Sequence, residues 1–428
     1  MVVSTISMAQ QTFASSGSAL NRGAVVVGSD LNSAFYNPAA PSFMLAGEVG
    51  FQTNFIAPFG AGYEVGEIDS LIDELEELID ILESDSLSAQ DALNAKDRFD
   101  PFLKNAAKNG MVKLGASAAL PFMPVMYHSN EFGTFYSDIR LSGSLRSTVI
   151  DDDIDIIMLN DLFTINTAAA VYVKSAGLVS LGLGYSRPVW EYNGGLIHAG
   201  LKINVNQYAL SKNIISLAGL EDGEDIGDAI ADDYEANANT SVNVGVDAGI
   251  IWVSDNFNAG LAITDINAPQ YDYGTLVSSA NECRSLSGMS LENCFVAQDA
   301  IAQGRINGNE VFVANVQATL SASTWLGEQV RWGFHTSIDL NDKNDAIGDI
   351  YQWANAGATA QFNNWLVPEL RFGYTKNLAG TELGYYSVGI TFLKQAELDV
   401  RWSDESVDID NTSAPRSAYF SFAIQTKF

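Results

Sequence analysis

The C-terminal segment of the chain alternates between apolar and polar side chains. Phe420, Phe422 and Ile424 occupy even-numbered positions, whereas Ser421 and Gln425 occupy odd-numbered ones. Successive side chains of a β-strand point to opposite faces, so this segment is predicted to form a strand with one apolar and one polar face. The same alternation recurs upstream, for example over 196–210, 239–253, 330–341 and 396–404.

We predict fourteen strands, most of them about ten or more residues long, which is the length that a tilted strand needs to cross a membrane. A soluble sandwich seldom contains so many strands of that length. The predicted fold is therefore all-β, a 14-stranded antiparallel transmembrane β-barrel. The predicted strands are 46–56, 111–122, 132–147, 164–187, 196–210, 239–253, 257–266, 310–323, 330–341, 351–362, 367–377, 383–393, 396–404 and 416–428.

Every second connection between these strands tends to be long, as in outer-membrane barrels, which have short periplasmic turns and long external loops. Five tryptophans fall at or beside the short connections, where an aromatic girdle would lie. The sequence thus predicts the outer membrane of a Gram-negative bacterium, with the lipid bilayer and lipopolysaccharide as partners. An even strand count also returns the last strand, ending in Phe428, to the periplasmic side for the outer-membrane assembly machinery.

One predicted strand, 164–187, is too long for a single crossing of the membrane. Two interpretations are open. The strand projects beyond the membrane, or a hairpin at residues 175–177 divides it and changes the strand count.

The first predicted external loop, 57–110, contains a helical repeat. Leu71, Leu75, Leu78 and Leu82 recur at helical spacing among acidic residues, which predicts an acidic amphipathic helix over about 68–82. This helix could form a lid over the barrel mouth, or it could simply pack on the neighbouring loops.

Charge and composition narrow the function. The chain has 428 residues and a formal net charge of −30, which excludes nucleic acid as a partner. The sequence contains no apolar run of eighteen residues, so no transmembrane helix is predicted. The aspartates at 151–153 and the acidic run 221–235 are interpreted as solvated loops or calcium-binding loops. Without a recognisable ligand spacing, neither a metal site nor a cofactor is expected.

Two features indicate export from the cytoplasm. Cys283 and Cys294 lie eleven residues apart in a polar segment, and they form either a local disulfide or two free thiols. Residues 1–9 resemble the end of a signal peptide, with Ser7-Met8-Ala9 as the small-x-small pattern before cleavage.

Residues 10–45 precede the barrel, 46–428, and are small, polar and irregular, which suits a plug that fills the lumen. The stretch from Gly23 to Asp30, followed by Phe35-Tyr36-Asn37-Pro38-Ala39, resembles the N-terminal hatch of the FadL-type outer-membrane transporters of hydrophobic compounds. With the acidic helix after the first strand, the chain is most similar to the TraF-like, or conjugal transfer, branch of that superfamily.

This resemblance implies that the hatch lies inside the barrel and lines a ligand route. The resemblance assigns this role in the ligand route directly to Asn37, Pro38 and Ala39, and to the neighbouring Phe35 and Tyr36. A turn closed by Asn37 before the φ-locked Pro38 would explain the same residues without any role in transport.

The polar strand faces place cations in the predicted lumen, chiefly Arg140, Arg146, Arg331 and Arg371. An unpaired cation could hold the carboxylate of a ligand. Because acidic side chains share these faces in nearly equal number, mutually neutralising pairs are the alternative.

The sequence contains no catalytic motif, and no serine is predicted to pair with His198 or His335, so we do not expect an enzyme. The leading hypothesis is passive uptake of a hydrophobic, fatty-acid-like molecule through the plugged lumen. A structural or assembly protein that binds a partner through its external loops is the second, and a general porin is the third.

Overall fold

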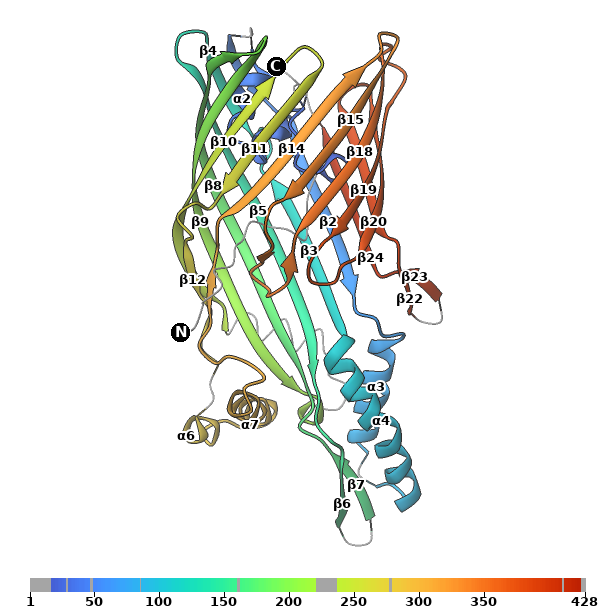
Figure 1. Cartoon of the computed structure of the whole chain (residues 1–428). Helices are drawn as coiled ribbons and strands as arrows, with labels where there is room; N and C mark the ends of the chain where they lie inside the picture. The colour runs from blue at the N-terminus through green and yellow to red at the C-terminus, as the bar shows by residue number, and fades with distance from the viewer. Residues whose placement is uncertain are drawn as a thin grey trace.

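The computed structural model describes residues 17–27, 30–46, 49–84, 86–159, 162–220, 237–276, 279–409 and 412–424. Fourteen antiparallel strands form a closed ring, which β5 completes by pairing with both β3 and β8 (Figure 1). The predicted fold is confirmed. In ring order the strands are β2 (Ile56–Val65), β3 (Met111–Ala119), β5 (Gly133–Ile150), β8 (Ala170–Tyr192), β9 (Gly195–Ser216), β10 (Asn239–Val253), β11 (Phe257–Thr264), β14 (Gln317–Leu326), β15 (Val330–Asp339), β18 (Trp353–Phe362), β19 (Glu369–Asn377), β20 (Gly384–Phe392), β21 (Ala396–Ser403) and β24 (Ser417–Ile424).

The two faces of the wall differ in polarity as the alternation predicts. On β9, Leu201 is 61% exposed whereas the neighbouring Lys202 is only 2% exposed. The lumen buries polar residues, and the outer surface exposes large apolar ones such as Ile203, Val388 and Phe420. An apolar outer surface on a closed antiparallel barrel is the architecture of the Gram-negative outer membrane, which confirms the predicted location.

The first wall strand is not where the sequence predicts it. In the described part of 46–56 the structure has the short β1 (Gly50–Thr53) and the first residue of β2, which is the wall strand. Pro58, Gly60 and Gly62 lie within β2 and hide its alternation, because such residues normally interrupt a strand. β1 pairs instead with β4 (Val125–Ser129), which extends the sheet beside β5.

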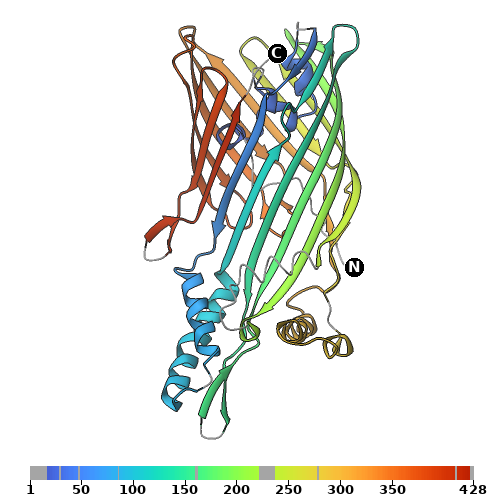
Figure 2. The same cartoon turned by 180° about the vertical axis from the view of Figure 1, so that it is seen from behind.

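The wall is taller on one side. β5, β8 and β9 contain 18, 23 and 22 residues. The strands on the other side of the barrel, β18, β19, β20, β21 and β24, contain only 8 to 10 residues each. The projecting-strand interpretation of 164–187 is therefore correct, and no hairpin divides β8. The separate hairpin of β6 (Asp155–Leu159) and β7 (Leu162–Asn166) lies beyond the ends of these long strands (Figure 2).

The first long connection contains two helices rather than one. α3 (Leu71–Leu82) is the predicted acidic helix, and α4 (Ala89–Asn109) is a helix that the sequence analysis missed. The buried face of α4 is built largely from alanines such as Ala92, Ala95 and Ala106, which give little apolar signal. Both helices pack against each other and against β7, so the packing interpretation describes the observed contacts.

Short elements complete the described chain. Within that part of the chain, no helix has the length and hydropathy needed to cross a membrane. The remaining elements are α1 (Ala19–Arg22), η1 (Leu31–Phe35), α2 (Ala40–Met44), η2 (Leu217–Gly219), β12 (Gln270–Asp272), α6 (Ala280–Cys283), α7 (Met289–Ala302), β13 (Val311–Val313), β16 (Lys343–Asn344), β17 (Ile350–Tyr351), β22 (Ser406–Ile409) and β23 (Thr412–Pro415).

Several sequence predictions concern residues outside the described ranges. These are the signal-peptide remnant 1–9, the first part of the predicted plug at 10–16, the acidic run 221–235 and the terminal Phe428.

Candidate functional site

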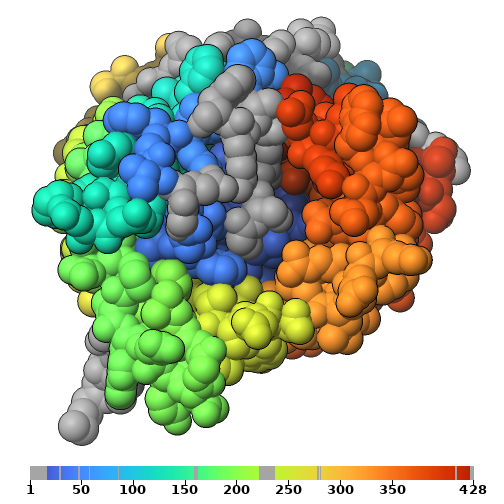
Figure 3. All heavy atoms as spheres, turned by 90° about the horizontal axis from the view of Figure 1, so that it is seen from above, coloured from blue at the N-terminus to red at the C-terminus, as the bar shows by residue number. Residues whose placement is uncertain are grey.

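Residues 17–27 and 30–46, called here the N-terminal segment, lie inside the ring of strands. α1 contacts β18, β19 and β21, whereas α2 contacts β5, β8 and β9. Seen from above, this segment lies within the barrel wall (Figure 3). Nearly all of its side chains are buried, including the polar Asn21, Arg22 and Asn32. Polar residues can be buried here because the lumenal wall supplies polar partners.

The Asn37-Pro38-Ala39 stretch forms a tight turn between η1 and α2. The side-chain Oδ1 of Asn37 accepts a hydrogen bond from the backbone N–H of Ala39 at 2.9 Å, and the backbone oxygen of Asn37 accepts one from Ala40 at 3.0 Å. Pro41 then occupies the first turn of α2, where its missing N–H costs nothing. The turn explanation of these residues therefore holds locally, whatever role the segment has.

A cross-strand pair of glycines on the wall accommodates this turn. Gly200 of β9 faces Gly249 of β10 in the sheet register. A β-carbon at residue 249 would lie 3.0 Å from Cγ of Asn37, and one at residue 200 would lie 2.7 Å from the backbone nitrogen of Ala39. With Asn37 in place, any side chain at either position would displace the turn.

A second glycine pair accommodates the start of the segment. Gly357 of β18 faces Gly373 of β19, and a β-carbon at residue 357 would lie 2.5 Å from the backbone oxygen of Asn21. A β-carbon at Gly389 of β20 would lie 2.7 Å from Nδ2 of Asn21. The N-terminal segment thus contacts the wall on two opposite sides, each time over glycines.

Arg371 belongs to a neutralised network below α1. Its guanidinium pairs with Asp399 at 2.9 Å and with Glu369 at 3.1 Å, and Arg22 of the segment also pairs with Glu369. Asn21 donates a hydrogen bond to Asp399. The arrangement matches the mutual-neutralisation alternative, and it ties the segment to the wall.

Two of the other predicted lumenal arginines, Arg140 and Arg146, have acidic partners as well. Arg140 lies 3.2 Å from Asp138, which also pairs with Lys202 at 2.6 Å. Arg146 pairs with Asp349 at 3.1 Å. Arg331 is exposed, and its guanidinium lies 4.8 Å from the centre of the Trp325 ring.

A cavity of about 160 Å³, called here the chamber, lies between the N-terminal segment and the wall. Phe35 and Tyr36 of the segment line it, together with Arg140. Asn37, Pro38 and Ala39 lie nearby without lining it. The wall lining is mixed, because Ala118 and Leu141 are apolar whereas Asp339, Lys343 and Asn355 are polar or charged.

Arg401 also lines the chamber, and its surroundings are unusual for a buried cation. Its guanidinium lies 4.4 Å from the Tyr419 ring centre, 4.8 Å from Tyr385 and 5.3 Å from Trp353. Within the described ranges Arg401 forms no ion pair, and its Nε and Nη2 atoms have no hydrogen-bond partner. Three cation–π contacts, at roughly 0.5–2 kcal/mol each, stabilise the guanidinium against the several kcal/mol that a buried unpaired charge costs.

The structure corrects one sequence-based expectation, because a serine does lie against a histidine. Oγ of Ser42 lies 2.8 Å from Nδ1 of His198, and Ser42 also donates to the backbone oxygen of Ala39. Both residues are buried, and among the described residues no carboxylate hydrogen-bonds His198. The contact anchors α2 to β9.

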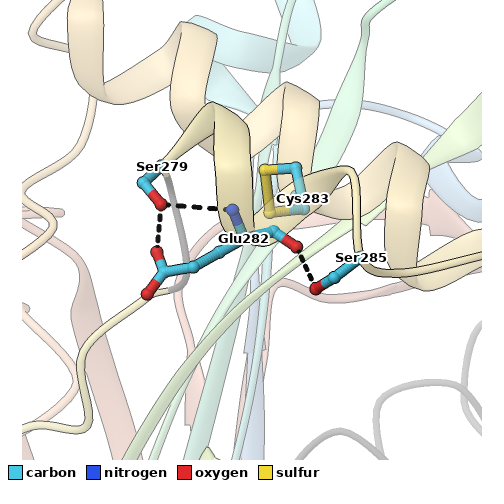
Figure 4. The surroundings of a disulfide bond; sticks show 5 residues. Ser279, Glu282, Cys283 and Ser285 are labelled. Carbon is cyan, nitrogen blue, oxygen red and sulfur yellow. Dashed lines mark hydrogen bonds between the residues drawn. A yellow bond between two sulfur atoms is a disulfide. The ribbon is translucent and has the colours of Figure 1, made fainter.

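The predicted disulfide between Cys283 and Cys294 is present and joins α6 to α7 (Figure 4). The Ser279 side chain accepts a hydrogen bond from the Glu282 N–H at the start of α6, and Ser285 donates to the Glu282 carbonyl after it. α7 packs on β9 outside the chamber, so the disulfide stabilises the long-loop end of the barrel.

Sequence reasoning missed the glycine pairs and the aromatic rings around Arg401. The sequence does contain a signal for the glycines. Gly249 and Gly373 occupy positions that alternate with the apolar, lipid-facing residues of their strands, where most of the other residues are polar and face the lumen. A glycine on an inward parity marks a place where another backbone approaches closely.

The chain was also compared with curated proteins, solved structures and family models. No curated protein matches the chain. Among solved structures, the Pseudomonas putida toluene transporter TodX is similar over 96% of this chain and 98% of its own, with 11% identity and a TM-score of 0.40. The Ralstonia pickettii toluene transporter TbuX is similar over 93% and 94%, with 11% identity and a TM-score of 0.37. A Pseudomonas aeruginosa FadL homologue is similar over 98% of both chains, with 11% identity and a TM-score of 0.34.

The family model described as "F plasmid transfer operon, TraF, protein" matches residues 34–339, which is more than half of the chain. This match confirms the predicted TraF-like branch. The chain therefore belongs to the family of the F plasmid transfer operon TraF protein.

Proposed function

We propose that this protein takes up a hydrophobic small molecule across the outer membrane, with residues 10–45 acting as a plug. The chamber is the single observation that supports this most strongly, because it combines the rings of Phe35, Tyr36 and Trp353 with a wall lining that also carries polar and charged side chains such as Arg401. Transfer of apolar surface from water into such a site is favourable by roughly 25 cal/mol per Å². No energy source is needed for passive uptake down a gradient.

The size of the chamber limits what it can hold in this state. A chamber of about 160 Å³ has room for one small ring or a short chain, and its polar lining residues suit a ligand that carries a polar group as well. A fatty-acid-like ligand is longer and would require the N-terminal segment to move. Displacement of that segment is accordingly part of the proposal.

Arg401 is the residue that we expect to select the ligand's head group. A guanidinium that lacks a counter-ion forms strong, charge-assisted hydrogen bonds with a carboxylate. The proposed ligand is thus an apolar chain or ring that carries an acid group, and Arg401 would hold the acid at the chamber wall.

The test is direct binding and uptake by the full-length protein in proteoliposomes, with a fluorescent medium-chain fatty acid as the probe. We expect Arg401→Met to weaken binding of the acid about tenfold or more, with little effect on the corresponding alcohol. Arg331→Met is the matched control, because Arg331 also contacts a tryptophan ring but is exposed. Equal uptake by protein-free liposomes would contradict the proposal.

A structural or assembly role is the second candidate, and the family description, which names a plasmid transfer operon, favours it. The long-loop end carries ordered units that a partner could bind, the α3–α4 hairpin and the disulfide-linked α6–α7 unit. Cross-linking of intact cells through cysteines placed in α3 would distinguish the two. A stoichiometric partner, with no acid bound by the purified protein, would favour the structural role.

A further inference from the structure

Residues 340–352, called here the inner loop, connect β15 to β18 and turn into the lumen instead of outward. Ile347 is fully buried, and Ala346, Asp349 and Tyr351 are buried as well. A loop that hides its backbone in this way needs polar partners there. Some of these partners come from β16 and β17, which pair with each other. Others come from the Asp345 carboxylate, which accepts hydrogen bonds from the backbone N–H groups of Ile347 and Asp349.

The inner loop reaches the far side of the barrel. Counted along the ring of fourteen strands, β5 with Arg146 is the sixth strand from β15. Counted the other way round the ring, β3 with Lys113 is the sixth strand from β18. Both cations bind Asp349, Lys113 at 2.5 Å and Arg146 at 3.1 Å. The loop therefore crosses nearly the full diameter of the lumen.

The attachment at the far side is a cluster of charged groups that is buried except at Arg146, whose side chain is 29% exposed. Lys113 is fully buried and also pairs with Glu64 of β2 at 3.0 Å and with the Tyr351 hydroxyl at 2.9 Å. Two cations thus face two carboxylates. Because breaking a buried pair by removal of one partner leaves an uncompensated charge, Asp349 holds the loop strongly while all four groups are present.

Apolar contacts hold the tip of the same loop. Ala346 and Ile347 pack with Tyr208, Tyr271 and Phe312 at the β9 side of the wall, and the Tyr273 hydroxyl donates to the Ala346 carbonyl. Lys343 of the loop lines the chamber, as does Gly23 of the N-terminal segment. The chamber is therefore bounded by the inner loop towards the long-loop end and by the N-terminal segment towards the other.

We propose that the inner loop is an outer gate of the chamber, latched across the lumen by Asp349 on Lys113 and Arg146. Access from the long-loop side then requires the latch to release. The latch controls access alone and does not depend on the identity of any ligand.

The test is accessibility of a chamber cysteine in the full-length protein. Thr375 lines the chamber and is buried, so Thr375→Cys reports access by a charged, membrane-impermeant thiol reagent added from the long-loop side of proteoliposomes. We expect slow labelling in the otherwise native chain and about tenfold faster labelling when Asp349→Asn is added, which corresponds to about 1.4 kcal/mol. The matched control is Lys104→Met, which breaks an exposed pair with Asp153 outside the lumen and leaves the rate unchanged.

A second variant covers the case in which Asp349→Asn does not fold. The N–H of Trp353 donates to the Asp339 side chain at 3.0 Å, so the ends of the loop are adjacent and residues 343–350 can be replaced by a short glycine-serine turn. This variant is expected to label as fast as Asp349→Asn or faster. Native labelling rates in a folded barrel that lacks residues 343–350 would overturn the gate.

Discussion

Asn37 occupies space on the wall that is open only because residue 249 is glycine. A β-carbon at Gly249 would lie 3.0 Å from Cγ of Asn37, and it would approach the amide oxygen more closely still. The facing residue on β9 is Gly200, so two adjacent strands lack side chains where the turn contacts them. The position of the N-terminal segment therefore depends on the wall as much as on its own turn residues.

Gly249→Val is expected to displace this turn while the barrel remains folded. Overpacking a tight contact costs typically about 1–3 kcal/mol, so the amides of residues 30–45 should exchange hydrogen faster by one to two orders of magnitude. Hydrogen exchange with mass spectrometry measures this. Gly143→Val is the control, because a β-carbon there meets nothing within 4 Å. Unchanged exchange in Gly249→Val would show that the segment does not rest on this wall.

Val388→Arg tests the outer face. Val388 lies in the middle of β20, is exposed, and pairs across the strands with Phe372 and Val400. A charge on the lipid face near the midplane costs about 2–4 kcal/mol, so unfolding from lipid vesicles should need correspondingly less denaturant. Ser406→Arg in the exposed β22 should have no such effect. Equal stability of the two variants would be incompatible with a lipid-facing β20.

The packing of α3 on α4 is expected to weaken in acid. A hydrogen bond from Arg98, at 2.7 Å, holds the pKa of the Glu77 carboxylate below its usual 4.5. Because the folded-state pKa is depressed, this contribution is complete above pH 4.5 and is lost as the pH falls through the lowered pKa. Hydrogen exchange of the α3 amides, corrected for the intrinsic pH dependence of exchange, should therefore accelerate as the pH falls below 4.5. Glu77→Gln should show faster exchange already at neutral pH and a flatter acid response; an identical pH profile would refute the assignment.

Loss of the disulfide should act locally. A cross-link that closes a loop of this size stabilises by about 3 kcal/mol in the chain-entropy model. In the double variant Cys283→Ser, Cys294→Ser, the amides of α7 should lose protection because Val296 and Ala297 no longer stay packed near Ile214. The wall strands should keep theirs. Loss of protection throughout β9 and β10 would contradict a local role.

The sequence predicts elements where polarity alternates cleanly. β10 (Asn239–Val253) coincides with its predicted range because Val242, Val244 and Val246 mark the lipid-facing side. β2 was placed about nine residues too early, since Pro58 and its glycines suppress that signal. α4 was missed because alanines form its buried face.

The site is less predictable because it depends on long-range registers. The parity rule places Arg371 and Asp399 in the lumen, but only the pairing through β20 brings them within 2.9 Å. The inner loop resembles an ordinary external loop in sequence, and its inward path depends on Lys113, more than two hundred residues away. Such contacts cannot be read from local pattern.

The most direct measurement of the central claim, that the N-terminal segment occupies the lumen and must move for uptake, is a cysteine cross-link between Asn37→Cys and Gly249→Cys. A sulfur at residue 37 would replace Cγ, which lies 3.0 Å from the β-carbon position at residue 249, so the geometry suits a disulfide. We predict spontaneous formation of this disulfide in the folded barrel, loss of fatty-acid uptake while it is oxidised, and recovery on reduction, with wild-type uptake unaffected by the same reductant. A folded barrel in which the two cysteines stay unlinked, or in which uptake continues with the link closed, would contradict the account.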